Sequence, residues 1–360
     1  MNTMKSSKSL WTCLSLFLLL FLGAFNISAE ESMPASEKRT EISKTFKVSS
    51  SDNLTIDNRY GDVTVTHWDK NEIEIKVVIT AKASTDKRVE ELFKYVDVEL
   101  NKSGKTVYGK TSMANFSGTR NNERLNIHYY INKPSRIKSS FELRYGNIYL
   151  PRENDAHTTL LVKYGNIHAG DFKDKLLVDC SYGNINLGDL NEAVIDIAYC
   201  GGVIVGSGKV LNIDSRYSNG EIRDFEQLNL DLSYGNFSAR NLGIANIDAK
   251  YSNLDVKQLG KRMYADFSYG SFTIKSVSSD FSEVKAEARY GNLNITLPPN
   301  MACEVVAENM RYATYKISDQ FNAQTSKNNH SYRSLINNGH ASRKIIFSGN
   351  GYSNLAVKAQ

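Results

Sequence analysis

A sequence repeat dominates this chain and limits what it can fold into. A Tyr-Gly-Asn motif preceded by Arg, Lys or Ser recurs with small variations, starting for example at Arg144, Lys163, Ser181 and Ser233. An earlier copy starts at Arg59. The ten tyrosines that occupy this place in the repeats from Tyr145 to Tyr312 follow one another at intervals of 17 to 22 residues. A nearly constant period of this length is typical of arrays in which each repeat is one unit stacked on the next.

The apolar residues within each repeat alternate with period two, which predicts strands. Leu228, Leu230 and Leu232 precede Tyr234, and Phe237 and Ala239 follow it. This spacing places alternate side chains on one face of a strand. The Gly-Asn after each Tyr shifts the alternation by one residue, as expected where a turn needs residues that tolerate positive φ. Each repeat therefore reads as a strand, a Tyr-Gly-Asn corner, a second short strand and a polar turn.

An antiparallel meander and a parallel β-solenoid are the two architectures that this repeat allows. Near-identical units favour the solenoid, because stacking equivalent strands places Tyr on Tyr and Asn on Asn every ~4.8 Å. The prolines agree, since none lies between 152 and 297, where it would remove a ladder hydrogen bond. We predict an all-β chain: a parallel β-solenoid (β-helix) of about ten 17–22-residue coils, with an N-terminal strand-rich cap containing one short helix.

The chain divides into six predicted segments. The helix of the cap follows Ser84 and Thr85, because Val89, Leu92 and Phe93 recur at helical spacing there. We expect a signal peptide over 1–29, a flexible linker over 30–45, an N-terminal coil and capping region over 46–135, the solenoid repeats over 136–319, a polar loop over 320–343 and closing strands over 344–360.

The N-terminal residues predict export. Lys5 and Lys8 precede an apolar run, and Ala29 offers a small residue for cleavage. No later apolar run is long enough to span a bilayer, so no transmembrane segment is expected in the mature chain. The net charge of +5 is mild and no nucleic-acid motif occurs, so no nucleic-acid partner is expected. The predicted location is the periplasm or the cell surface.

In a solenoid, residues at the same position of successive repeats form a column along the stack. Two such columns at the corner are expected to be structural. The Tyr column has the same parity as the buried apolar residues, so its rings are predicted to face inward, whereas sugar-binding aromatics would have to face out. The Asn that follows is predicted to form a hydrogen-bond ladder along the stack. The Tyr column comprises Tyr145, Tyr164, Tyr182, Tyr199, Tyr217, Tyr234, Tyr251, Tyr269, Tyr290 and Tyr312.

An acidic column lies three residues before Tyr and is predicted to face outward. Its members are Glu142, Asp179, Asp196, Asp214, Asp231, Asp248, Asp266 and Glu287. Like charges ~4.8 Å apart repel by ~0.9 kcal/mol even in water. Basic residues one position before Tyr, such as Arg144 and Arg216, could compensate for this repulsion in a ladder of ion pairs. The alternative is a row of Ca²⁺ ions, which oxygen ligands suit; no other cofactor is expected.

A basic stripe of four residues is the candidate ligand-binding surface. Arg223, Arg240, Lys257 and Lys275 occupy the sixth position after Tyr in four consecutive units. The stripe is either a solvated face or a contact for an anionic partner, whose binding would weaken with salt. An acidic polysaccharide, envelope lipid headgroups or an envelope protein would be such a partner. The oligomeric state is not indicated.

The cysteines and histidines do not indicate an enzyme. Cys180 and Cys200 are about three residues out of register, or ~10 Å, beyond the ~7 Å limit for a disulfide, so both are predicted to be buried free thiols. The six histidines are scattered and no catalytic motif occurs, so no catalytic residue is assigned. A polysaccharide-active β-helix enzyme remains the alternative class, because some β-solenoids are lyases or hydrolases.

The corner motifs, the alternation and the signal peptide together resemble a family of bacterial β-strand-repeat proteins known as putative adhesins. This is a domain family of unknown function, akin to the head domain of autotransporter-type adhesins, and the resemblance covers roughly residues 46 to 358. It implies an exported, non-catalytic β-solenoid of the cell envelope that acts as an adhesin-like or polymer-binding module. A periplasmic structural or sensor scaffold without an adhesive role is the alternative.

Overall fold

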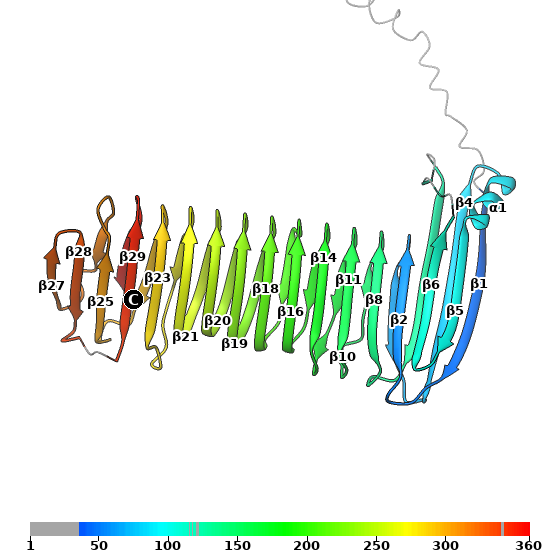
Figure 1. Cartoon of the computed structure of the whole chain (residues 1–360), viewed down its shortest axis with the longest axis horizontal. Coiled ribbons are helices and arrows are strands. Elements are labelled where there is room, and N and C mark those ends of the chain that lie inside the picture. Colours follow the sequence, from blue (N-terminus) through cyan, green and yellow to red (C-terminus); the bar gives the residue numbers. More distant parts are fainter. Residues whose placement is uncertain (1–35, 115, 117, 120–121, 340–341) are drawn as a thin grey trace, which may run out of the picture.

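The computed structural model describes residues 36–360 apart from 115, 117, 120–121 and 340–341. The predicted signal peptide, 1–29, lies outside the described residues. Thirty strands belong to one sheet and are spaced side by side along the long axis of the molecule (Figure 1). The all-β class and the one short helix predicted from the sequence are confirmed.

Most strands pair in parallel with the equivalent strand one repeat away. They form two long rows, joined at the Tyr corners. The first row contains, in spatial order, β2 (Asn53–Arg59), β8 (Lys138–Arg144), β11 (Thr158–Lys163), β14 (Leu176–Ser181), β16 (Leu190–Ala198), β18 (Gly208–Arg216), the second halves of β19 (Asn219–Ser233), β20 (Asn236–Lys250) and β21 (Asn253–Ser268), then β23 (Glu283–Arg289), β29 (Lys344–Asn350) and β25 (Cys303–Glu308).

The second row holds the shorter strands that follow the corners. It contains β3 (Val63–His67), β9 (Ile148–Tyr149), β12 (Ile167–Ala169), β15 (Asn184–Leu187), β17 (Gly202–Val205), the first halves of β19, β20 and β21, then β22 (Ser271–Ile274), β24 (Asn292–Leu297), β30 (Asn354–Ala359) and β26 (Tyr315–Ile317). The two-residue strands β10 (Glu153–Asn154) and β13 (Asp171–Phe172) pair beside the rows, and β13 also pairs with the start of β16.

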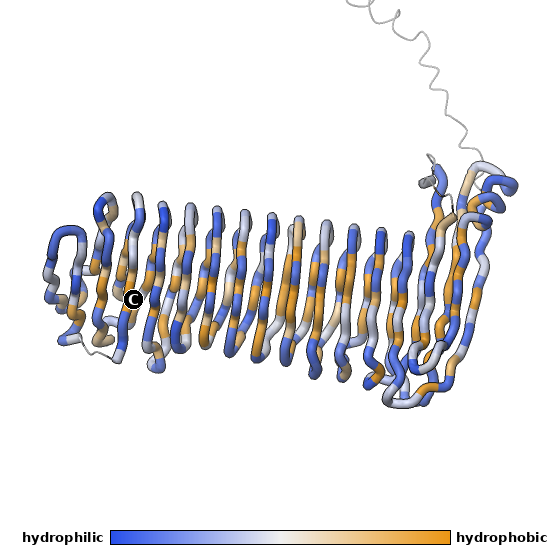
Figure 2. Tube along the Cα trace, in the orientation of Figure 1, coloured by the Kyte–Doolittle hydropathy of each residue, from blue (hydrophilic) through white to orange (hydrophobic). Residues whose placement is uncertain are grey.

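A continuous apolar core runs the length of the molecule. The alternating residues predicted to face inward do so: Leu228, Leu230 and Leu232 are buried, as are Phe237 and Ala239. They belong to one cluster that extends from Phe46 to Val357. In Figure 2 the hydrophobic colour recurs at a similar height in successive strands, as expected when equivalent positions stack on one another.

The N-terminal end is covered by a strand-rich region with a helix, as predicted. β4 (Glu72–Ala83) pairs antiparallel with β1 (Ser36–Lys47) and β7 (Arg124–Lys133), and β5 (Val96–Ser103) pairs with β6 (Thr106–Met113). β6 and β7 lie parallel to β2 and β3 and so connect this region to the two rows.

Helix α1 (Asp86–Lys94) begins where the sequence places it, because the Thr85 side chain accepts a hydrogen bond from the backbone N–H of Arg88. Its Val89 and Leu92 side chains are buried against the region that covers the N-terminal end.

Two expectations about the ends of the chain are wrong. Residues from Ser36 onward, predicted as part of a linker, form β1. The segment 320–343, predicted as a polar loop, contains the antiparallel hairpin of β27 (Ala323–Asn328) and β28 (Ser331–Ile336). The closing strand β29 also inserts between β23 and β25, so the last repeats do not stack in chain order.

Candidate functional site

The corner between the two rows is formed by a tyrosine in the left-handed backbone region. The φ angles of Tyr60 and of the nine members of the Tyr column from Tyr145 to Tyr290 lie between 52° and 62°. The sequence prediction assigned positive φ to the Gly-Asn pair, and this was wrong. The glycines are required by close packing instead: a Cβ on Gly165 would lie 1.8 Å from the carbonyl oxygen of Gly146 in the adjacent coil.

The tyrosine rings face solvent, which corrects the prediction that they point inward. Tyr145, Tyr164 and Tyr182 are 51%, 43% and 46% exposed. The left-handed conformation turns the chain at this residue, so the alternation counted from the preceding strand does not extend to it. The prediction that the column has a structural role is not contradicted by this exposure and stays a prediction.

The exposed rings form a stacked ladder. Adjacent ring centroids from Tyr60 to Tyr290 are 4.8 to 5.2 Å apart, with interplanar angles of 0° to 14°. Phe116 meets the first ring edge-on at 5.3 Å. Tyr312, predicted as the last member, is not stacked in line: it contacts Tyr352 at 5.7 Å with a tilt of 34°.

The asparagine column forms the predicted hydrogen-bond ladder. The Asn166 amide donates to Oδ1 of Asn147 at 2.8 Å, and Asn184 donates to Asn166 at 3.0 Å. Asp62 begins the series by accepting from the backbone N–H and the amide of Asn147. The ladder skips the coil of Gly202, then continues from Asn219 through Asn236 and Asn253.

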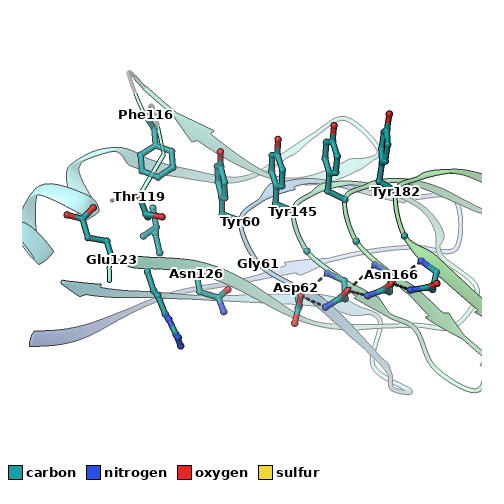
Figure 3. Close-up of a pocket in the computed structure, with 18 of the residues that line it drawn as sticks. Tyr60, Gly61, Asp62, Phe116, Thr119, Glu123, Asn126, Tyr145, Asn166 and Tyr182 are labelled. Atoms are coloured by element: carbon teal, nitrogen blue, oxygen red, sulfur yellow. Dashed lines mark hydrogen bonds between the residues drawn. The ribbon is translucent and has the colours of Figure 1, made fainter. Parts of the chain in front are cut away.

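A groove follows the corners at the N-terminal half of the stack. We call it the corner groove; Tyr145, Tyr164 and Tyr182 line one side, and Asn147, Asn166 and Asn184 line the other. Its volume is about 1050 Å³. Figure 3 shows the rings and the amides in two rows, with the glycine backbone between them. β7 contributes Arg124 and Asn126 at one end.

The acidic column lies in register on the outer face, as predicted. Asp179, Asp196, Asp214, Asp231, Asp248, Asp266 and Glu287 stand opposite one another on successive strands, and Leu161 separates them from Glu142. Arg144 pairs with Glu142 at 3.0 Å, and Arg216 pairs with Asp196 at 2.8 Å and Asp214 at 3.7 Å.

Compensation by these bases is incomplete. Partial burial, followed by the neighbouring Asp248 and Asp214 carboxylates, raises the pKa of Asp231 above its ordinary value. The pKa of Asp179 is raised in the same way, by burial and by Asp196. In the described part of the chain, no group of three or more His, Cys, Asp or Glu side chains is arranged to hold a metal ion.

The four residues of the basic stripe are exposed; Arg223, Arg240 and Lys257 stand on adjacent strands, and Lys275 directly follows the next strand, β22. The register of their neighbours brings Arg223, Arg240, Lys257 and Lys275 side by side across β19 to β22. Asp224 accepts from Nε of Arg240 at 2.8 Å, and this guanidinium lowers the pKa of the Asp224 carboxyl. Lys275 lies 3.4 Å from Asp255.

Cys180, Cys200 and Cys303 are buried free thiols, which confirms the prediction made for Cys180 and Cys200. Although these two residues are out of register in the sequence, the Cys200 side chain contacts Cys180. Sγ of Cys200 lies 3.5 Å from the carbonyl oxygen of Cys180, because the corner turns this side chain inward. Cys200 occupies the place that Ser218 and Ser252 hold in later coils, where the hydroxyl accepts from a backbone N–H of the adjacent coil. The residue directly after each corner Tyr is small (Gly, Ser or Cys), and this pattern in the sequence could have indicated that the position is buried.

Comparisons with known proteins show similarity to several solved structures. The chain matches no known family model and no curated protein. It is similar to a putative cell adhesion protein from Clostridium sporogenes, with 12% identity, 90% of this chain and 100% of that chain covered, and a TM-score of 0.20. It is also similar to a putative lipid binding protein from Parabacteroides distasonis, with 14% identity, 88% and 96% covered, and a TM-score of 0.32.

A putative adhesin from Parabacteroides merdae is similar too, at 10% identity, with 71% and 95% covered and a TM-score of 0.30. The adhesin names agree with the resemblance seen in the repeats. No helix among the described residues is long and apolar enough to cross a membrane.

Proposed function

We propose that this chain is an exported, non-catalytic β-solenoid of the cell envelope that acts as an adhesin-like or polymer-binding module. One observation carries the proposal: exposed columns of like side chains recur from coil to coil along the stack. Such a surface repeats by translation, and so does a linear polymer. A partner with a matching repeat can make the same contact on several coils, which raises the strength of binding through multivalency.

The basic stripe is the proposed contact for an anionic polymer. Arg240 and Lys275 have acidic neighbours, whereas Arg223 and Lys257 have no ion pair within the described chain. The stripe can therefore attract an acidic polysaccharide, phosphorylated lipid headgroups or an acidic envelope protein. Because all four side chains are exposed, the attraction is screened at high salt.

Binding is tested by co-sedimentation with purified anionic envelope polysaccharide at low and high salt. A variant with Ala at Arg223, Arg240, Lys257 and Lys275 should lose the salt-sensitive binding. A control variant with Ala at four exposed lysines that do not form a row, Lys94, Lys105, Lys316 and Lys327, should keep it. Equal binding by the two variants would refute the role of the stripe.

The same incubations test the enzyme alternative, because a polysaccharide-active enzyme would shorten the polymer. The proposal predicts that the length distribution of the polymer stays unchanged.

Location is tested by treating intact producing cells with protease. An epitope tag after Gln360 suits this assay because that residue is exposed. Loss of the tag while a periplasmic control protein is protected would support the surface role. Protection of the tag until the outer layer is broken would support the periplasmic scaffold and refute adhesion.

A further inference from the structure

The corner groove offers hydroxyl groups that the protein itself does not use. The phenol oxygens of Tyr145, Tyr164 and Tyr182 make no hydrogen bond within the described chain, and their rings are about half exposed. Adjacent rings are 5.0 and 4.9 Å apart, so the hydroxyls form a regular row (Figure 3). Each hydroxyl can both donate and accept a hydrogen bond.

The opposite side of the groove offers a second regular row. The Asn166 and Asn184 amides each donate one hydrogen bond to the preceding Asn, while the accepting Oδ1 also receives a backbone N–H. A side-chain amide has two N–H donors, so one N–H of each amide is left for a ligand.

Two kinds of ligand contact are excluded by the packing. The ring faces inside the ladder cover one another, so a ligand reaches only ring edges and hydroxyls, not a free aromatic face. An added peptide strand is excluded because the backbone groups beside the groove already pair: the N–H of Ile148 donates to Asn166, and the N–H of Tyr145 donates to Lys163. The remaining contacts are polar side chains in two rows.

The distribution of charge in the groove favours a neutral polymer over an anionic one. Its charged lining residues, Asp62, Glu123 and Arg124, lie at the end near β7, and the tyrosine, glycine and asparagine rows carry no charge. Lys163 Nζ lies 5.5 Å from the ring centroid of Tyr164, but the hydroxyls and amides of the two rows are themselves uncharged. A neutral chain with hydroxyls on every unit can therefore bond to both rows.

We propose that the corner groove binds a neutral linear polysaccharide that lies along the stack, with its hydroxyls bonded to the phenol row and the amide row. The proposal rests on the proposed polymer-binding function and assigns that function a second site, on earlier coils of the stack than the basic stripe. The polymer contacts successive coils in the same way, because each of the coils of Tyr145, Tyr164 and Tyr182 contributes one phenol and one amide.

The test uses hydroxyl deletions that keep the ladder. The groove variant carries Tyr145→Phe, Tyr164→Phe and Tyr182→Phe, which leave the ring contacts in place. The control variant carries Tyr234→Phe, Tyr251→Phe and Tyr269→Phe, which belong to the same ladder but lie outside the groove lining. The probes are three neutral hexasaccharides, cellohexaose, maltohexaose and N-acetylated chitohexaose, titrated calorimetrically into each purified protein.

We expect at least one probe to bind the unmodified chain and the control variant equally. Binding to the groove variant should be at least about tenfold weaker, since each of the three lost hydrogen bonds weakens binding by about twofold or more. Added NaCl should leave the affinity unchanged. Failure of all three probes to bind, or equal binding by the two variants, would overturn the proposal. In that event, continued salt-sensitive binding of anionic polymer by the stripe would leave the proposed function intact.

Discussion

The tyrosine ladder should stabilise the stack through ring contacts, and Tyr217 is the position at which to measure this. Its ring centroid is 5.0 Å from that of Tyr199 and 4.8 Å from that of Tyr234, and both pairs are parallel within 3°. An aromatic pair contributes ~0.5–1.5 kcal/mol beyond burial, so Tyr217→Ala should lower the free energy of unfolding by ~1–3 kcal/mol. Tyr217→Phe keeps both contacts and should change it by less than ~0.5 kcal/mol.

The left-handed backbone conformation of Tyr217 allows a second, independent substitution. The φ of Tyr217 is 52°, a region that costs residues with a Cβ ~1–2 kcal/mol. Tyr217→Gly removes the ring contacts as Ala does, but it also removes this strain. The glycine variant should therefore be at least as stable as the alanine variant.

The assay is urea unfolding followed by far-UV circular dichroism for the three variants. Tyr352→Ala is the matched control, because this ring is 70% exposed and tilted by 34° from both of its aromatic neighbours, Tyr290 and Tyr312. Tyr352→Ala should lower the free energy of unfolding less than Tyr217→Ala does. If Tyr217→Ala and Tyr217→Phe unfold at the same urea concentration, the ladder does not stabilise the stack and the argument is refuted.

Three further predictions concern the other columns. Asp231→Asn should raise stability at neutral pH, because folding raises the pKa of this carboxyl and so disfavours its charged form. The folded state then binds more protons than the unfolded state between its raised pKa and the ordinary value of 3.8. In thermal melts, acidification from neutral pH to 3.8 should therefore stabilise the unmodified chain more than the variant. Ser252→Ala should lower the free energy of unfolding by ~1–3 kcal/mol in urea titrations, since it leaves the buried N–H of Gly235 unpaired. Cys200→Ser should leave it nearly unchanged, because Ser218 and Ser252 already fill equivalent places. Equal effects of the two substitutions would contradict this assignment. Calcium and a chelator should give the same melting temperature, because each coil contributes at most one carboxylate to the acidic column. A rise with calcium would favour the metal alternative.

Periodicity predicted the positions that depend on local alternation. Leu228, Leu230 and Leu232 were assigned to one face of a strand from their spacing alone, and all three are buried. The acidic and asparagine columns were likewise predicted, because residues at equal distances from a repeated corner meet when equivalent strands pair.

The features that were missed depend on backbone geometry or on contacts between distant segments. The tyrosine itself takes the positive φ, so its ring leaves the face that parity assigns to it and lines a groove that the sequence did not indicate. The same turn brings the Cys200 side chain to Cys180. Nor could alternation indicate that β29 inserts between β23 and β25, since each of these strands has a similar pattern.

Each repeat should advance the stack by one strand spacing, and a distance between two labels tests this. Asp179 and Asp266 lie five pairings apart in the acidic column. Spin labels on Asp179→Cys and Asp266→Cys, in a chain with Ser at Cys180, Cys200 and Cys303, can be measured by pulsed electron paramagnetic resonance. Parallel stacking predicts a separation near ~24 Å, five spacings of ~4.8 Å. A meander, with two strands per repeat in one sheet, would give ~48 Å and contradict the account.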